Sequence, residues 1–108
     1  MAVFAVQYVY VNRPESLGEV RPQHRAFLSG LLAEGTLLAS GPYVTGPGTT
    51  WPDEQAPPGA LLLVRAESPE AAATLLEADP FYVEGLIEER SVRGWVPVMG
   101  PFSDEPGV

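Results

Sequence analysis

Apolar residues fall into short runs that predict alternating strands and helices along the chain. Four runs rich in Val, Leu, Tyr and Phe predict β-strands: residues 2–11, 36–44, 60–66 and 87–99. The first and third runs are apolar at odd and even positions alike, which is typical of strands in the centre of a sheet. The second contains Gly41-Pro42 and the fourth contains Pro97 among charged residues, so we expect both at sheet edges. A bulge is the alternative reason for Gly41-Pro42.

The stretch between the first two strands has the spacing of a helix with one apolar face. Apolar residues recur at that spacing over residues 27–32, and Gly35 is a natural end to the helix. Residues 16–19 have the Ser-x-x-Glu spacing of a capping box. Pro22 nevertheless predicts a loose turn there, with the main helix beginning at Pro22.

The stretch between the last two strands predicts a second helix. It begins at Ser68-Pro69-Glu70, which combines a capping residue, a proline at the first helical position and an early acid. Alanine and leucine residues over 71–76 form its apolar stripe. Asp79-Pro80 ends it, and we expect the Asp79 side chain to cap a further short turn over residues 81–83.

The predicted order of elements, βαββαβ, indicates an α+β, ferredoxin-like fold with a four-stranded antiparallel sheet and both helices on one face. Right-handed crossovers place the first and third strands in the centre. Two helices cover only one face, whereas the central strands are apolar on both. We therefore expect a homodimer that packs sheet to sheet and covers the second face.

A chain of 108 residues is long enough for one domain. We expect it to span residues 1–99, with residues 100–108 as a C-terminal tail that is frayed over residues 103–108. Residues 45–59 are rich in Pro, Gly and polar residues and predict a long connecting loop. A loop of this length is either mobile or has a task such as covering a site.

The charge and the missing residue types exclude several classes of chemistry. There is no Cys, and all six basic residues are arginines, so the chain has no thiol nucleophile, disulfide, cysteine zinc site, lysine Schiff base or Walker-type lysine. A formal net charge of -8 disfavours nucleic acid and anionic membrane surfaces as partners. The N-terminal residues lack the features of a signal peptide or a membrane span, so we expect a cytoplasmic protein.

His24 is the only histidine, so any imidazole chemistry near neutral pH depends on it. It precedes Phe27 and Leu28 by three and four residues, which places it on the apolar stripe of its helix. Asp79 lies one turn beyond Leu75 on the stripe of the second helix. Alone, each has a structural interpretation, as a core histidine satisfied by a carbonyl group and as a capping residue. Because both helices lie on one face of the sheet, the two side chains can meet and form an acid–base pair.

Other candidates surround this pair. Arg21, one turn before His24, can orient an anionic substrate, with a surface ion pair as the alternative role. Ser40 and the backbone near Gly41 can supply hydrogen-bond donors. Phe81 can line an apolar substrate pocket, as can several other aromatic residues whose alternative place is the core or the dimer interface: Tyr8, Tyr10, Tyr82 and Trp95. A metal held by His24 and carboxylates is an alternative that no ligand spacing supports, and we expect neither metal nor cofactor.

Three of these motifs together resemble the YciI-like (YCII-related) family of small proteins: Arg21-Pro22-x-His24, Leu37-Leu38-x-Ser40-Gly41-Pro42 and Asp79-Pro80-Phe81. The resemblance extends to about Met99. It implies a dimeric α+β barrel and a His–Asp centre that maps onto His24 and Asp79. We expect a small cofactor-independent enzyme of lyase or isomerase type acting on a small organic substrate, a substrate class implied by the resemblance alone. The alternative is a non-catalytic dimeric module that binds a small molecule or a protein partner.

Overall fold

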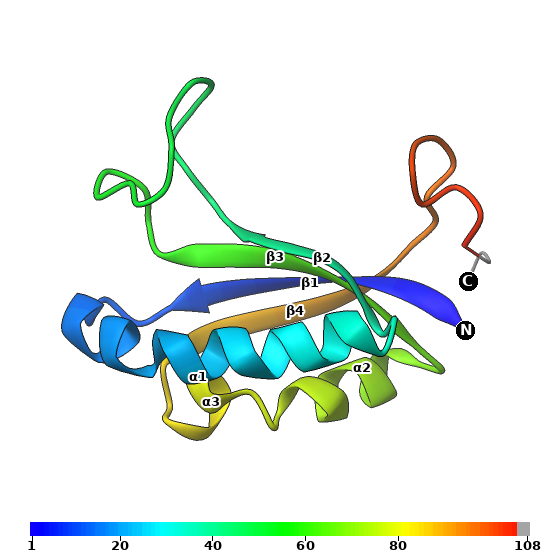
Figure 1. Ribbon diagram of the computed structural model, residues 1–108, viewed down its shortest axis with the longest axis horizontal. Coiled ribbons are helices and arrows are strands. Elements are labelled where there is room, and N and C mark those ends of the chain that lie inside the picture. Colours follow the sequence, from blue (N-terminus) through cyan, green and yellow to red (C-terminus); the bar gives the residue numbers. More distant parts are fainter. Residues whose placement is uncertain (106–108) are drawn as a thin grey trace.

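The computed structural model describes residues 1–105 (Figure 1). In chain order its elements are β1 (Ala2–Tyr10), α1 (Pro14–Ala33), β2 (Leu37–Pro42), β3 (Gly59–Ala66), α2 (Pro69–Leu76), α3 (Pro80–Val83) and β4 (Ile87–Trp95). The predicted order of strands and helices is confirmed, and the expected short turn after Asp79 is the one-turn helix α3.

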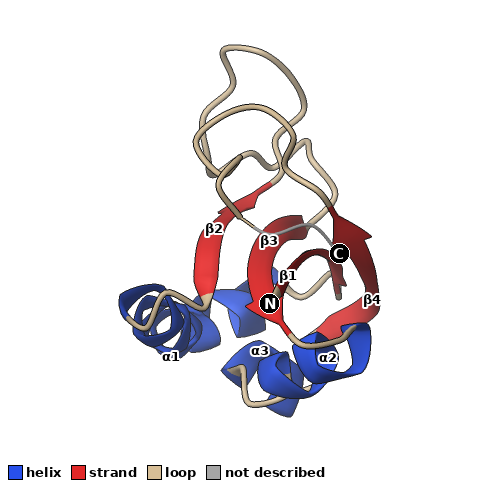
Figure 2. Cartoon of the chain, turned by 90° about the vertical axis from the view of Figure 1, so that its right-hand side faces the viewer, coloured by secondary structure: helices blue, strands red, loops and turns tan. Residues whose placement is uncertain are grey.

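The strands form one antiparallel sheet in the order β2-β3-β1-β4. The predicted positions of the central and edge strands are therefore confirmed. All three helices lie along the same face of the sheet (Figure 2). No helix within residues 1–105 is both long enough and apolar enough to cross a membrane.

The hydrophobic core lies between this face and the helices. Phe4, Val6 and Tyr8 of β1 and Leu62 of β3 point into it and are at most 2% exposed. On the opposite face Ala5, Leu61 and Leu63 are only partly buried, and Val9 is 40% exposed. The apolar alternation on both faces of the central strands thus corresponds to one covered face and one open face.

Helix α1 begins at Pro14, so the prediction that residues 16–19 form a loose turn was wrong. Pro22 lies inside the helix and is exposed, which leaves the Gly18 carbonyl without its helical partner but within reach of water. Leu17, on the two turns before Pro22, is 3% exposed and belongs to the core. Burial of such a side chain contributes about 2 kcal/mol, which offsets most of the roughly 3 kcal/mol that an internal proline costs.

The fourth strand ends at Trp95, four residues before the predicted end. Pro97 cannot donate to the ladder, and beyond it Val98 and Met99 are 76% and 88% exposed. Residues 100–105 form turns, and the Glu105 carboxylate pairs with the Arg65 guanidinium. Residues 106–108 lie outside the described part of the chain.

The long loop between β2 and β3 rises from the sheet on the side away from the helices (Figure 1). It contains its own hydrogen bonds, which centre on Asp53. The Asp53 carboxylate accepts from the Thr45 backbone N–H and hydroxyl, both at 2.7 Å, and from the Gln55 N–H at 3.0 Å. These bonds hold the pKa of Asp53 below its ordinary value. Its own hydrogen bonds therefore hold the loop in a folded conformation beside the sheet.

Candidate functional site

The His24 and Asp79 side chains form a buried pair, although 55 residues separate them in the sequence. The His24 Nδ1 atom lies 2.8 Å from Asp79 Oδ1 and 2.9 Å from Oδ2. Asp79 is 0% exposed and the imidazole about 11%. A carboxylate only accepts hydrogen bonds, so this geometry places a proton on Nδ1 and directs it at the carboxylate.

Asp79 is positioned by the short helix that it begins. Its backbone is extended, Pro80 follows at the first helical position, and Oδ1 also accepts the Phe81 backbone N–H at 2.9 Å. The capping role expected from the sequence is thus present together with the contact to His24. The three hydrogen-bonding contacts keep a fully buried carboxylate from being left without partners.

Phe81 holds the plane of the imidazole. The two rings are stacked, with centroids 4.0 Å apart and planes 11° from parallel. Tyr10 packs edge-on against Phe81, with a centroid distance of 5.2 Å. Phe81 is only 1% exposed, and it lines the groove beside His24.

His24 lines a groove, and its second ring nitrogen, Nε2, is not used by the contact to Asp79. It makes no hydrogen bond within residues 1–105, yet it is not among the buried polar atoms that are sealed from solvent. The groove has a volume of about 1480 Å³ and lies between α1, the edge strand β2 and the long loop. A base at this nitrogen can therefore reach a small molecule in the groove.

The tyrosines next to the pair stay protonated at neutral pH. Burial, and then the negative charge of Asp79, raise the pKa of Tyr8 and the pKa of Tyr10 well above their ordinary value. The Tyr8 hydroxyl is buried and has no partner within residues 1–105. Tyr10 lines the groove. Neither phenol can therefore act as a base at neutral pH.

The remaining predicted site residues line the same groove. Ser40 pairs with Leu62 across the strands, so its side chain shares the helix-covered face of the sheet. Gly41 pairs in register with Leu61, and the irregularity of β2 lies between Leu37 and Ala39. The bulge considered for Gly41 was therefore wrong in position. Arg21 lines the groove one turn from His24.

Two residues of the groove, Trp51 and Arg25, were missed by the sequence analysis. The indole ring of Trp51, from the long loop, lies against both Arg21 and Arg25 of α1. The guanidinium carbons are 5.0 and 5.1 Å from the ring centroid. The one-turn spacing of the two arginines was visible in the sequence, but nothing local indicated that Trp51 folds back onto them.

No group of three or more His, Cys, Asp or Glu side chains within residues 1–105 could hold a metal ion.

Comparison with known proteins gives three results. A family model described as the YCII-related domain matches residues 2–96. Protein YciI of Escherichia coli O6:H1 (strain CFT073) and that of Shigella flexneri are each 36% identical over 74 residues, which cover 68% of this chain and 74% of the relative. A solved structure, 5-chloro-2-hydroxyhydroquinone dehydrochlorinase (TftG) from Burkholderia phenoliruptrix AC1100 in complex with 2,5-dihydroxybenzoquinone, is similar with a TM-score of 0.62. It shares 26% identity, and the match covers 86% of this chain and 92% of that one.

Proposed function

The chain belongs to the YCII-related family, and we propose that it is a small enzyme that performs acid–base chemistry of lyase or isomerase type on a small organic molecule. One observation carries this proposal. His24 lines the groove, its Nδ1 atom lies within 2.9 Å of both Asp79 oxygens, and its Nε2 atom is not sealed from solvent. The proposed step uses no cofactor.

In the proposed step, His24 is the base and Asp79 orients it. A substrate proton moves to Nε2, the electron pair left behind forms a double bond, and a leaving group departs with its bonding electrons. In an isomerisation the same proton returns at another atom instead. The Asp79 carboxylate, 2.8 Å from Nδ1, stabilises the imidazolium that forms. Stacking on Phe81 keeps the imidazole ring in one plane while the proton is transferred.

The structural neighbour supports this class of reaction. TftG is a dehydrochlorinase, and it is complexed with the small cyclic compound 2,5-dihydroxybenzoquinone. By analogy with TftG, we propose that the substrate of this chain is a small cyclic compound that carries a leaving group. Arg21 would orient an anionic oxygen of the substrate, and the Ser40 hydroxyl and the Gly41 backbone would provide further hydrogen bonds from β2.

We also propose that the protein is a homodimer that packs through the open face of its sheet. Ala5, Val9, Leu61 and Leu63 leave apolar surface on this face. The long loop and the segment after β4 both rise beside the face and would flank a second copy (Figure 1). Two faces of this kind are self-complementary about a two-fold axis.

The direct test is chloride release from 5-chloro-2-hydroxyhydroquinone and related halogenated hydroquinones by the wild-type protein and by H24N. The asparagine side chain can still donate a hydrogen bond to Asp79, but it cannot accept a proton from a substrate at neutral pH. We expect turnover to fall by at least about 100-fold, the usual contribution of a general base. Gln23, the exposed neighbour of His24, provides a matched control as Q23N, which should retain full activity.

Two results would count against the proposal. Turnover by H24N within a few-fold of the wild type would exclude His24 as the base. A wild-type rate equal to the uncatalysed background for every compound would favour the alternative, a non-catalytic binding module.

A further inference from the structure

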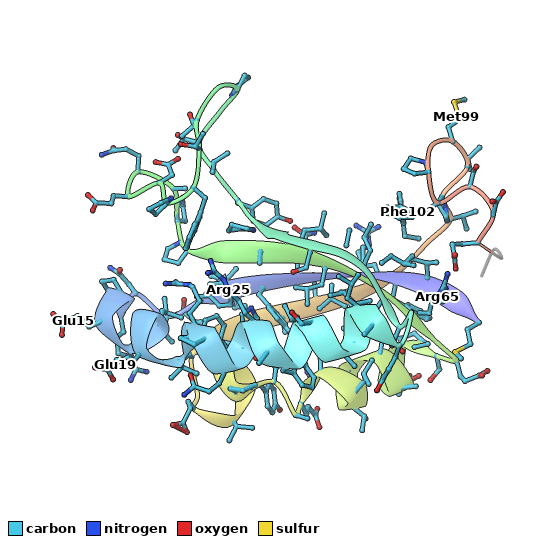
Figure 3. The ribbon with its side chains drawn as sticks, viewed as in Figure 1. Glu15, Glu19, Arg25, Arg65, Met99 and Phe102 are labelled. Carbon is cyan, nitrogen blue, oxygen red and sulfur yellow. The ribbon has the colours of Figure 1, made fainter. Side chains whose placement is uncertain are left out.

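Arg21 and Arg25 line the groove one helical turn apart, and within residues 1–105 neither forms an ion pair, although Asp53, Glu54 and Glu88 line the same groove. The ion pairs of residues 1–105 are His24–Asp79, Arg65–Glu105 and Arg90–Glu77. Acidic residues outnumber basic ones by 14 to 6, so carboxylates are abundant in this chain. The acids at the start of α1, Glu15 and Glu19, lie toward its outer end, away from Arg25 (Figure 3).

Holding these two cations together costs free energy. Like charges four residues apart on a helix repel each other. Partial burial, and then the charge of Arg25, lower the pKa of Arg21, although an arginine remains charged at neutral pH. An anion bound between the two guanidinium groups would remove this repulsion, which indicates a place for a ligand.

Trp51 orders the two arginines without using their donors. Both guanidinium groups lie about 5 Å from its ring centroid, a distance typical of cation–π contacts. Contact with an aromatic face leaves the in-plane N–H groups free to donate to an oxyanion. Trp51 is itself 41% exposed, so part of the indole is available to stack on a planar ligand. The hydrogen bonds around Asp53 hold the loop that carries it.

The position of this cluster relates it to the acid–base pair. Arg21 and Arg25 occur one turn before and one residue after His24, and all three line the same groove. A ring whose anionic oxygen contacts the arginines would extend along the groove toward Nε2.

We propose that Arg21, Arg25 and Trp51 form a subsite for a planar organic anion, such as a hydroxyquinone, phenolate or aromatic carboxylate. This names the substrate class of the proposed enzyme and rests on that proposed function for the reaction itself. Binding by the subsite does not require His24 to act as a base, so the two proposals can fail separately.

The test is calorimetric titration with 2,5-dihydroxybenzoquinone, whose vinylogous acid groups are ionised at neutral pH, and with its neutral dimethyl ether. The absence of Lys and Cys leaves few nucleophiles to trap a quinone covalently, so reversible binding can be measured. We expect the anion to bind at least about tenfold more tightly than the ether. R25Q should lose about tenfold in affinity for the anion and little for the ether, as expected for a charge-assisted contact.

The control variant R13Q removes the same charge from an exposed position outside the groove and should bind both compounds like the wild type. Affinity of R25Q for the anion within twofold of the wild type would overturn the subsite. Equal affinity of the wild-type protein for both compounds, or no binding of either, would also overturn it. H24N separates the two proposals: it should keep the preference for the anion while losing turnover. Turnover by H24N would contradict the proposed function but not the subsite.

Discussion

Two substitutions of Asp79 distinguish its structural role from its proposed catalytic role. D79A removes the hydrogen bond to His24, worth about 2 kcal/mol for a charged acceptor, and the cap of α3, worth about 1 kcal/mol. D79N keeps an oxygen that can accept both the Phe81 N–H and the His24 Nδ1–H, so it should lose only the charge-assisted part of the first contribution, about 1 kcal/mol. With a urea m-value of about 1.5 kcal/mol/M, the unfolding midpoint should fall by about 2 M for D79A and by about 0.7 M for D79N.

The activities of D79A and D79N should not differ as their stabilities do. Both variants lose the carboxylate that fixes the imidazole, so both should lose at least about 100-fold in turnover despite their different stabilities. Ser68 offers a matched control, because its side chain caps α2 by accepting the Ala71 N–H at 3.0 Å. S68A should lose about 1 kcal/mol and keep full activity. A D79A midpoint within about 0.3 M of the wild type would refute the reasoning, as would full activity of D79N.

Three further predictions concern the fold and its assembly. L17A should lower the free energy of unfolding in urea by about 2–4 kcal/mol, because Leu17 anchors the turns of α1 before Pro22. L32A, at a 56% exposed position, should change it by no more than about 0.5 kcal/mol, and equal losses in the two variants would contradict this prediction. L63E should turn a sedimenting homodimer into a monomer by burying a charge in the open sheet face, and a wild-type monomer at micromolar concentration would exclude the dimer. The hydrogen bond from Arg65 holds the pKa of Glu105 below its ordinary value of 4.5. The wild type should therefore be more stable than E105Q at neutral pH, and this difference should disappear as the pH falls through the lowered pKa. A difference in stability that persists in acid would refute the pairing.

Much of this arrangement follows from local pattern. The apolar alternation of the strands and the two helical stripes predict the fold, and the placement of His24 and Asp79 on those stripes predicts their contact. The catalytic role of the pair stays a prediction. The start of α1 could not be predicted, because the cost of Pro22 is local whereas the compensating burial of Leu17 depends on the assembled core.

The proposed anion subsite is the part of the groove that no local pattern indicates. Pro and Gly residues predict a loop between β2 and β3, but the position of Trp51 depends on the hydrogen bonds of Asp53 to Thr45 and on α1 across the groove. Such contacts become visible only once the helix and the loop lie beside each other.

The protonation of the single histidine tests the central claim most directly. A nitrogen-15 spectrum of the imidazole contains signals from His24 alone. An acid–base pair requires the neutral ring to carry its proton on Nδ1, directed at Asp79, and a lone pair on Nε2. We predict this tautomer in the wild type and a mixture in D79A. A wild-type ring with its proton on Nε2 would contradict the account.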